Sequence, residues 1–182
     1  KGWGKCFSCY SNVPPEATQS ENFEDFNEPV VSRFVKMEPK QGLDMSSLDY
    51  QSFRGIKAET AKRYGVGYKD SDLIFPYGAS AAKVRKKGEK AFTIKGDWKG
   101  YKGLFGQDKF SADGKLVIVT EGEVDALSAF QMMGTKWPVV SVRNGAQAAL
   151  KDFKENYEWL DSFDSIFICF DNDSAGQEAT AK

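Results

Sequence analysis

The stretch Leu116-Val117-Ile118-Val119-Thr120-Glu121-Gly122-Glu123-Val124-Asp125 decides the fold of this 182-residue chain. Its first five residues form an apolar run typical of a strand buried on both faces of a sheet. A helical pattern follows from Glu123 and ends at Gly134, with apolar side chains on one face at Val124, Leu127, Phe130 and Met133. A strand followed at once by a helix is the repeating unit of a parallel α/β sheet.

The same order of strand and helix occurs twice more in the second half of the chain. Apolar runs at 137–142 and 165–170 predict two further buried strands, and helical patterns follow them at 145–157 and from about Ser174. Parallel strands need crossover connections, which these helices would supply. We therefore expect an α/β subdomain with a parallel sheet over residues 113–182.

The preceding segment, 47–112, has a different pattern. Short apolar runs separated by glycines predict small antiparallel strands at 73–77, 82–85 and 91–94. Helices are predicted at 47–50 and 57–64, and Gly65 ends the second of them. We expect this part to be an α+β subdomain with Phe92 in its core.

The first 46 residues lack such patterns. Residues 13–46 are rich in Pro, Glu, Asn and Ser, which predicts a linker or irregular arm. Residues 1–12 contain Cys6-Phe7-Ser8-Cys9, a spacing suited to one corner of a zinc site, although tetrahedral zinc needs four ligands. A redox pair is the alternative, but such pairs normally begin a helix after a strand. Because the chain starts on this motif and stops inside a helical pattern, we expect it to be a fragment.

Composition excludes several classes of protein. The chain has no histidine, which rules out Ser-His-Asp triads, Cys-His dyads and His-ligated metals within it. Its three cysteines do not form a disulfide framework, and Cys169 falls in a predicted buried strand. No apolar run is long enough for a membrane span or a signal peptide, so we expect a cytoplasmic protein without a membrane partner.

Acidic residues directly follow two of the predicted strands. Glu121 comes after the strand at 116–120, and Asp171 and Asp173 come after the strand at 165–170. The carboxyl ends of parallel strands meet at one edge of a sheet, where α/β proteins bind their ligands. Carboxylates gathered there repel one another unless a cation neutralises them, and oxygen ligands alone favour Mg²⁺ or Mn²⁺ over Zn²⁺.

A helix N-cap is the alternative role for each of these acids, and either Asp173 or Ser174 could be one. The occurrence of two acidic clusters, each after a buried strand, favours the metal site. Gly122 would let the backbone approach a metal or phosphate, and Gly176 would let its helix pack closely.

Charge is sorted along the chain. Residues 83–102 hold eight basic side chains against two acidic ones, whereas residues 150–182 hold eight acids against three lysines. Basic residues neutralise phosphates, and aromatic residues among them can stack on bases. Alternation along the strands places Lys83, Arg85 and Lys90 on one face, so we expect these three to bind nucleotide or nucleic acid. A sheet edge kept soluble by lysines is the alternative.

Taken together, strand-Glu121-Gly122-x-x-Asp125 and strand-Asp171-x-Asp173-x-x-Gly176 resemble the Toprim signature of primases, topoisomerases and related nucleases. The whole series of segments resembles the primase half of the T-odd bacteriophage primase-helicases, a group that also includes the mitochondrial Twinkle helicase. The further segments, in the order of that family, are Cys6-Phe7-Ser8-Cys9, Arg54-Gly55-Ile56, Lys83-Val84-Arg85, Lys90-Ala91-Phe92, Leu104-Phe105-Gly106 and Gly145-Ala146-x-Ala148.

The resemblance implies a DNA primase, which makes short RNA primers on a DNA template by metal-dependent nucleotidyl transfer. Glu121, Asp171 and Asp173 would hold the catalytic Mg²⁺ or Mn²⁺, and Lys90 would join them in catalysis. Nucleotide or DNA would contact residues of both subdomains, namely Lys83, Arg85, Lys90, Gly122, Asp125 and Gly145.

The same resemblance implies partners beyond this chain. Cys6 and Cys9 would belong to a zinc ribbon that holds Zn²⁺ only in the full-length protein. Single-stranded DNA, ribonucleoside triphosphates and a hexameric helicase fused in the parent chain are the implied partners, in the host cytoplasm if the protein is viral. Two other functions stay open: a different Toprim enzyme that cleaves strands, or a degenerate primase segment that only binds DNA for a helicase.

Overall fold

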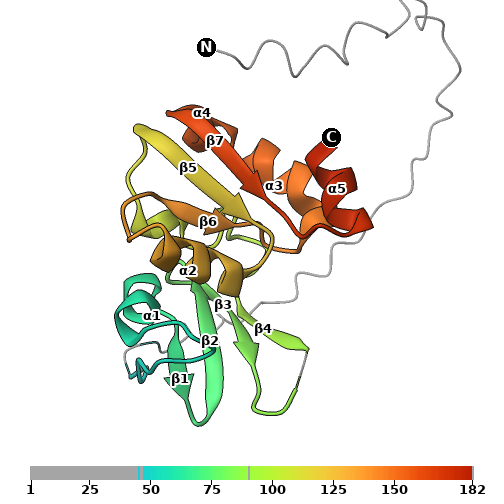
Figure 1. Ribbon diagram of the computed structural model, residues 1–182. Coiled ribbons are helices and arrows are strands. Elements are labelled where there is room, and N and C mark those ends of the chain that lie inside the picture. Colours follow the sequence, from blue (N-terminus) through green and yellow to red (C-terminus); the bar gives the residue numbers. More distant parts are fainter. Residues whose placement is uncertain (1–44, 46, 90, 182) are drawn as a thin grey trace, which may run out of the picture. The chain divides into compact units, whose positions relative to one another are not determined.

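The computed structural model describes residues 45, 47–89 and 91–181 (Figure 1). The predicted half zinc ribbon with Cys6 and Cys9, the predicted linker at 13–46 except for residue 45, and the predicted catalytic Lys90 therefore lie outside the described residues. No described helix is long and apolar enough to cross a bilayer.

An antiparallel sheet forms the first part of the described chain. Its strands are β1 (Gly67–Lys69), β2 (Asp72–Tyr77), β3 (Ala81–Arg85) and β4 (Phe92–Gly96), paired in the order β1-β2-β3-β4. Helix α1 (Ala58–Tyr64) precedes them, and Gly65 ends it with a left-handed φ of 72°, a conformation that favours glycine. The predicted strands and the helix at 57–64 are confirmed.

The short helix predicted at 47–50 is wrong. Asp49 instead pairs with Tyr68 of β1 as an isolated antiparallel bridge, with both backbone hydrogen bonds at 2.9 Å. A helix of four residues forms too few hydrogen bonds to offset the conformational entropy lost in its first turn. Pairing with an existing strand gives the same backbone groups hydrogen-bond partners without that loss.

A parallel sheet forms the second part, in the strand order β6-β5-β7. Its strands are β5 (Gly114–Thr120), β6 (Val139–Ser141) and β7 (Phe163–Cys169). Helix α2 (Glu123–Met132) connects β5 to β6, and α5 (Ser174–Ala181) follows β7. The prediction of an α+β part followed by an α/β part with a parallel sheet is confirmed.

The single helix predicted at 145–157 is broken into three pieces: η4 (Ala146–Ala148), α3 (Ala149–Glu155) and α4 (Tyr157–Asp161). The break falls at the buried residue Asn156, whose φ is −118°. Its side-chain amide donates to the carbonyl of Lys102 at 2.9 Å and to that of Asp152 at 2.8 Å. An asparagine that bonds backbone groups in this way competes with the helical hydrogen bonds.

Helices cover the parallel sheet on both faces, as Figure 1 shows. Because side chains alternate along a strand, Ile118 of β5 packs with α2 on one face, while Val117 and Val119 pack toward α3 and α4 on the other. The cluster around Ile118 also contains Tyr64 of α1 and Phe75 of β2. One hydrophobic core therefore joins the antiparallel sheet to the α/β part.

Three burial predictions are wrong, two of them because the strand concerned lies at the edge of its sheet. Strand β7 lies at the edge of its sheet, so Phe167 is 57% exposed and Cys169 is also exposed. Strand β4 is likewise an edge strand, and Phe92, expected in the core, is 38% exposed. Helix α2 is turned so that Ala126 is buried while Met133, just beyond its end, is 45% exposed. Apolar periodicity marks a face but does not say what covers it.

Candidate metal centre and nucleic-acid interface

Glu121 and Asp171 meet at the carboxyl edge of the parallel sheet. Strands β5 and β7 run side by side up to the pair Thr120 and Cys169, so the residues that follow them leave the sheet together. The backbone N–H of Asp171 donates to Glu121 Oε2 at 3.4 Å. Gly145, in the turn after β6, also lies there, since a Cβ on it would come within 3.5 Å of Glu121 Oε1. The structure thus brings together three residues that the sequence singled out.

Asp125 adds a third carboxylate to this edge. Burial raises its pKa above the ordinary value of 3.8, the negative charge of Asp171 raises it further, and the positive charge of Arg54 opposes both. A Cβ on Gly122 would lie 2.6 Å from Asp125 Oδ2, so glycine at that position leaves room for the carboxylate. The pKa is thus raised mainly because the carboxyl is partly buried, and the neighbouring acids add to the effect.

Asp173 has the role of a helix cap. Its Oδ1 accepts the backbone N–H of Gly176 at 2.8 Å, in the first turn of α5. This is the N-cap alternative stated for the sequence, and for Asp173 it is confirmed. Only one of its two carboxylate oxygens takes part in this bond, so capping does not by itself exclude metal binding.

The expected close packing at Gly176 is also confirmed. A Cβ at this position would lie 2.0 Å from the carbonyl oxygen of Asp171, closer than any real contact. Helix α5 can therefore approach the backbone that presents Asp171 only because residue 176 has no side chain.

The acidic edge suits a hard divalent cation by its chemistry. Glu121, Asp171 and Asp173 offer oxygen donors only, and carboxylates gathered at one edge repel one another unless a cation neutralises them. In the part of the chain that the structure describes, no three acidic or cysteine side chains are already gathered closely enough to ligate one ion. Their side chains would have to turn toward a common ion to hold it.

Lys83 lies in a nearly closed environment. Its Nζ is 2.6 Å from Oε1 of Glu123, and the two side chains are 12% and 7% exposed. Tyr77 donates its hydroxyl to the same oxygen at 2.5 Å, and burial together with Glu123 raises the pKa of Tyr77 well above its ordinary value. Lys83 also donates to the carbonyl of Arg143.

Sequence reasoning did not select Glu123, Tyr77 or Arg143. Glu123 stood inside the acidic motif, but nothing in its spacing pointed to a partner forty positions earlier. The sequence does show that Glu123 lies in the first turn of a predicted helix that follows a strand. A carboxylate at that position is stabilised by the helix dipole.

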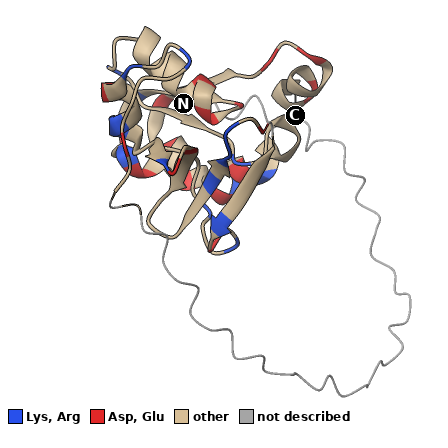
Figure 2. Cartoon of the chain, turned by 90° about the horizontal axis from the view of Figure 1, so that it is seen from below, with Lys and Arg blue, Asp and Glu red and all other residues tan. Residues whose placement is uncertain are grey.

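A cavity of about 850 Å³ lies beside the N-terminal end of α2. Its basic lining comes from Arg54, Arg85, Lys86 and Lys87, and Val124 of α2 contributes to its wall. Arg85 and Lys83 each lie 5.6 Å from the exposed ring of Phe92. Basic residues, blue in Figure 2, thus occur together with an exposed aromatic ring on the antiparallel sheet.

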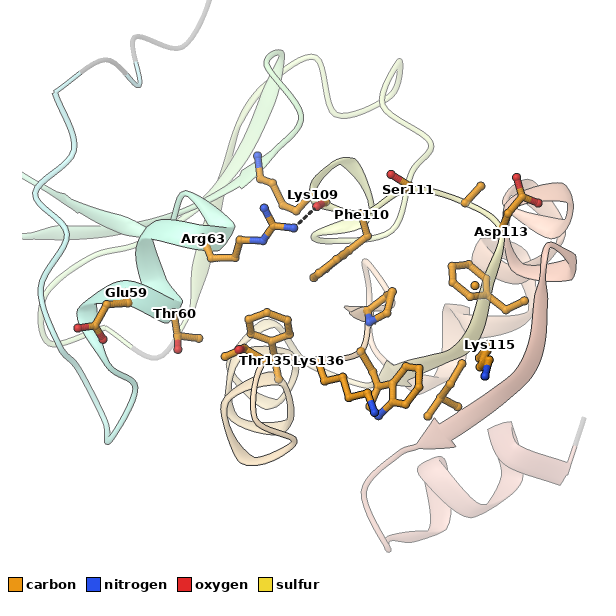
Figure 3. Close-up of a pocket in the computed structure, with 17 residues that line it drawn as sticks. Glu59, Thr60, Arg63, Lys109, Phe110, Ser111, Asp113, Lys115, Thr135 and Lys136 are labelled. Carbon is orange, nitrogen blue, oxygen red and sulfur yellow. Dashed lines mark hydrogen bonds between the residues drawn. The ribbon is translucent and has the colours of Figure 1, made fainter.

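Figure 3 shows a second cavity, of about 680 Å³, at the opposite end of the parallel sheet. It is lined by Gly114 and Lys115 at the start of β5, and by Arg63, which donates to the carbonyl of Lys109 at 2.7 Å. Glu121 follows the far end of the same strand, about 20 Å away at 3.3 Å per residue. We therefore assign the candidate site to the acidic edge and not to this cavity.

Known proteins share this fold and sequence. The profile of the Toprim-like family matches residues 118–182. The DNA helicase/primase of Enterobacteria phage T3 is 38% identical over an alignment of 135 residues that covers 69% of this chain and 23% of that protein. The crystal structure of the primase fragment of the bacteriophage T7 primase-helicase superposes with a TM-score of 0.65 at 35% identity, over 72% of this chain and 58% of the other. The chain belongs to the primase family of the phage primase-helicases.

A further structure supports the assignment to this primase family. It contains the T7 lagging-strand DNA polymerase interacting with primase domains bound to an RNA/DNA hybrid and dTTP, and one of its chains superposes with a TM-score of 0.62 at 34% identity. The match covers 72% of this chain and 71% of the other chain. The chain spans less than a quarter of the T3 helicase/primase, so it corresponds to one part of that protein.

Proposed function

We propose that this chain carries the catalytic core of a DNA primase, which makes short RNA primers on single-stranded DNA from ribonucleoside triphosphates. The observation that carries the proposal is the meeting of Glu121 and Asp171 at the carboxyl edge of the parallel sheet. Membership in the phage primase-helicase family supports the same reaction.

In this proposal Glu121, Asp171 and Asp173 hold Mg²⁺ or Mn²⁺. The metal, when bound, neutralises charge on the phosphates and on the attacking and leaving oxygens. The absence of a side chain at Gly122 leaves room for the Asp125 carboxylate, and Gly145 lies next to the Glu121 carboxylate. The chain's own contribution is to orient nucleotide and template against this edge.

The basic antiparallel sheet would bind the polyanions. Arg85 lines the 850 Å³ cavity beside α2, and it can neutralise phosphates there. Lys90 is proposed to bind phosphates together with Arg85 and to take part in catalysis. This role rests on the family resemblance alone. In the same proposal residues 47–112 are the basic subdomain and 113–182 the Toprim subdomain, after a linker at 13–46.

The wider assembly is proposed from the relatives. Residues 1–12, with Cys6 and Cys9, would form half of a zinc ribbon that holds Zn²⁺ in the full-length protein. A hexameric helicase, fused in the parent chain, would deliver the single-stranded template in the cytoplasm of the host cell.

The test is primer synthesis by the intact protein on single-stranded DNA with ribonucleotides and Mg²⁺. We expect Asp171→Asn to lower the rate by at least about 100-fold, since a lost metal ligand removes several kcal/mol of charge stabilisation. Asp164→Asn is the matched control, because Asp164 is an exposed carboxylate on the same strand, β7, away from the acidic edge. Undiminished synthesis by Asp171→Asn would refute the site.

Two further measurements separate the alternatives. Nicking of supercoiled DNA without nucleotides would indicate a strand-cleaving Toprim enzyme. DNA binding that does not depend on Mg²⁺, combined with no primer synthesis by the intact wild-type protein, would indicate a degenerate primase segment.

A further inference from the structure

Lys83 and Glu123 form a buried ion pair between the two sheets. The pair joins β3 of the antiparallel sheet to the first turn of α2, and its N–O distance is 2.6 Å. Tyr77 of β2 adds a second donor to the same oxygen of Glu123. The Glu123 carboxylate is therefore held by two donors that both come from the antiparallel sheet.

The surroundings of Lys83 leave it little access to a ligand. The rings of Tyr77, Phe92 and Trp98 each lie with their centres 5.6 Å from its Nζ. Besides Glu123, the ammonium group donates to the backbone carbonyl of Arg143. To bind phosphate directly, Lys83 would have to move away from these groups. Glu123 would then remain as a buried charge without its ion-pair partner, at a high cost in free energy.

The two groups that Lys83 holds flank the acidic edge. Glu123 is two residues after Glu121, and Arg143 is two residues before Gly145. Gly145 in turn approaches the Glu121 carboxylate. A single ammonium group thus contacts the helix start after β5 and the turn after β6, and Glu121 lies where these two segments meet.

The turn after β6 is anchored from its other side as well. The Arg143 side chain pairs with Asp152 and with Glu155, and it donates to the carbonyl of Tyr101. With that side fixed, Lys83 is the group that links the start of α2, through Glu123, to the turn after β6, while Tyr77 holds the same oxygen of Glu123 from β2.

We infer that Lys83 is a positioning residue that sets the place of Glu121 through Glu123 and the Arg143 carbonyl, without contacting phosphate itself. The inference rests on the proposed function insofar as Glu121 is a metal ligand. It assigns Glu123, an acid inside the Toprim motif, to the support of the metal site and not to the metal.

The test compares Lys83→Met with the double variant Lys83→Met/Glu123→Gln in the intact protein. The single variant leaves Glu123 charged, buried and unpaired, so the β5 turn should shift. In the double variant the glutamine can still accept from Tyr77, and as a neutral side chain it needs no counter-ion. If Lys83 positions Glu121 through Glu123, the double variant, in which both partners are neutral, should recover much of the Mn²⁺ affinity and stability that Lys83→Met loses.

The readout is the dissociation constant of Mn²⁺, measured by electron paramagnetic resonance, together with thermal unfolding. We expect Lys83→Met to weaken Mn²⁺ binding by about 10-fold or more, the usual effect of losing an outer-shell partner. The double variant should return to within about 3-fold of the wild type. Lys95→Met, which removes an exposed lysine of the neighbouring strand β4, serves as the control and should leave Mn²⁺ binding unchanged.

Two results would overturn the inference: unchanged Mn²⁺ binding by Lys83→Met, or a double variant as impaired as the single one. Should Lys83→Met not fold, Tyr77→Phe removes only the second donor to Glu123, and it should weaken Mn²⁺ binding in the same direction. Unchanged Mn²⁺ binding by a folded Tyr77→Phe would then count against the inference.

Primer synthesis is measured in parallel, and it separates this inference from the proposed function. A wild type that binds Mn²⁺ and shows the rescue, yet makes no primers, would refute the primase activity and leave the role of Lys83 standing. If the wild type makes primers but the double variant shows no rescue, the role of Lys83 would be refuted and the primase activity would stand.

Discussion

Arg143 and Asp152 form an ion pair in which almost nothing of either side chain is exposed. Their Nε and Oδ1 atoms are 3.1 Å apart, and the two side chains are 5% and 1% exposed. Asp152 also accepts the backbone N–H of Arg143 at 2.6 Å. One carboxylate therefore fixes both the backbone and the side chain of the turn that follows β6.

Removing this carboxylate should destabilise the protein strongly. Asp152→Ala leaves the Arg143 guanidinium buried without its main partner, which costs about 3–5 kcal/mol of the free energy of unfolding. Urea denaturation measures the loss. Lys151→Ala removes a neighbouring lysine that is 69% exposed and 4.0 Å from Glu155, and it should change stability by less than about 1 kcal/mol. Similar losses from both changes would contradict the assignment.

Gly176→Ala should impair the site more than the fold. The new Cβ cannot lie 2.0 Å from the Asp171 carbonyl, so α5 and the residues that present Asp171 must separate. A shift of about 1 Å in a reacting geometry can lower a rate by about 100-fold. We expect primer synthesis to fall while binding of single-stranded DNA is kept. Gln177→Ala, at the next position of the same helix, should retain most of the synthesis.

Phe92→Ala should weaken binding of single-stranded DNA. The exposed ring lies beside Lys83 and Arg85, and stacking on one base contributes about 1–3 kcal/mol. Fluorescence anisotropy of a labelled oligonucleotide measures the change. Ile94→Ala is the matched control, since Ile94 is an exposed apolar side chain of the same strand without a ring. Equal effects of the two changes would argue for a general apolar contact and against stacking.

The stability of the fold should fall in alkaline solution. The pKa of Tyr101 is raised from 10.0 to about 12, mainly by burial and also by the charge of Asp108, while Arg143 opposes the shift. The folded protein thus keeps a proton that the unfolded chain releases first. The stability from this group is complete below pH 10 and is lost as the pH rises through about 12.

Tyr101→Phe should therefore make the decline in stability between pH 10 and 12 less steep. Urea denaturation across this range compares the two slopes, because the lost hydrogen bond to the Leu104 carbonyl lowers stability equally at every pH. Absorbance at 295 nm should lose a tyrosine that ionises near pH 12. Equal slopes for the two proteins would contradict the shift.

Local patterns were sufficient for most of the secondary structure. The run at 116–120 and the helix after it contain enough apolar residues in a regular period to identify β5 and α2. Position along the chain then placed Glu121 and Asp171 at the same edge, because parallel strands end on the same side of a sheet. The sequence by itself therefore determined the elements, the parallel sheet and where its acids emerge.

Burial and partnership were decided by the tertiary structure. Phe92 and Phe167 lie in apolar runs like those of the core, yet their strands are at sheet edges, where a side chain lacks a covering layer. The same holds for Lys83 and Glu123: each is a charged residue of an ordinary local pattern, and only the packing of the two sheets brings them to 2.6 Å. Periodicity records the environment along one strand or helix, whereas an ion pair depends on how separate elements pack against one another.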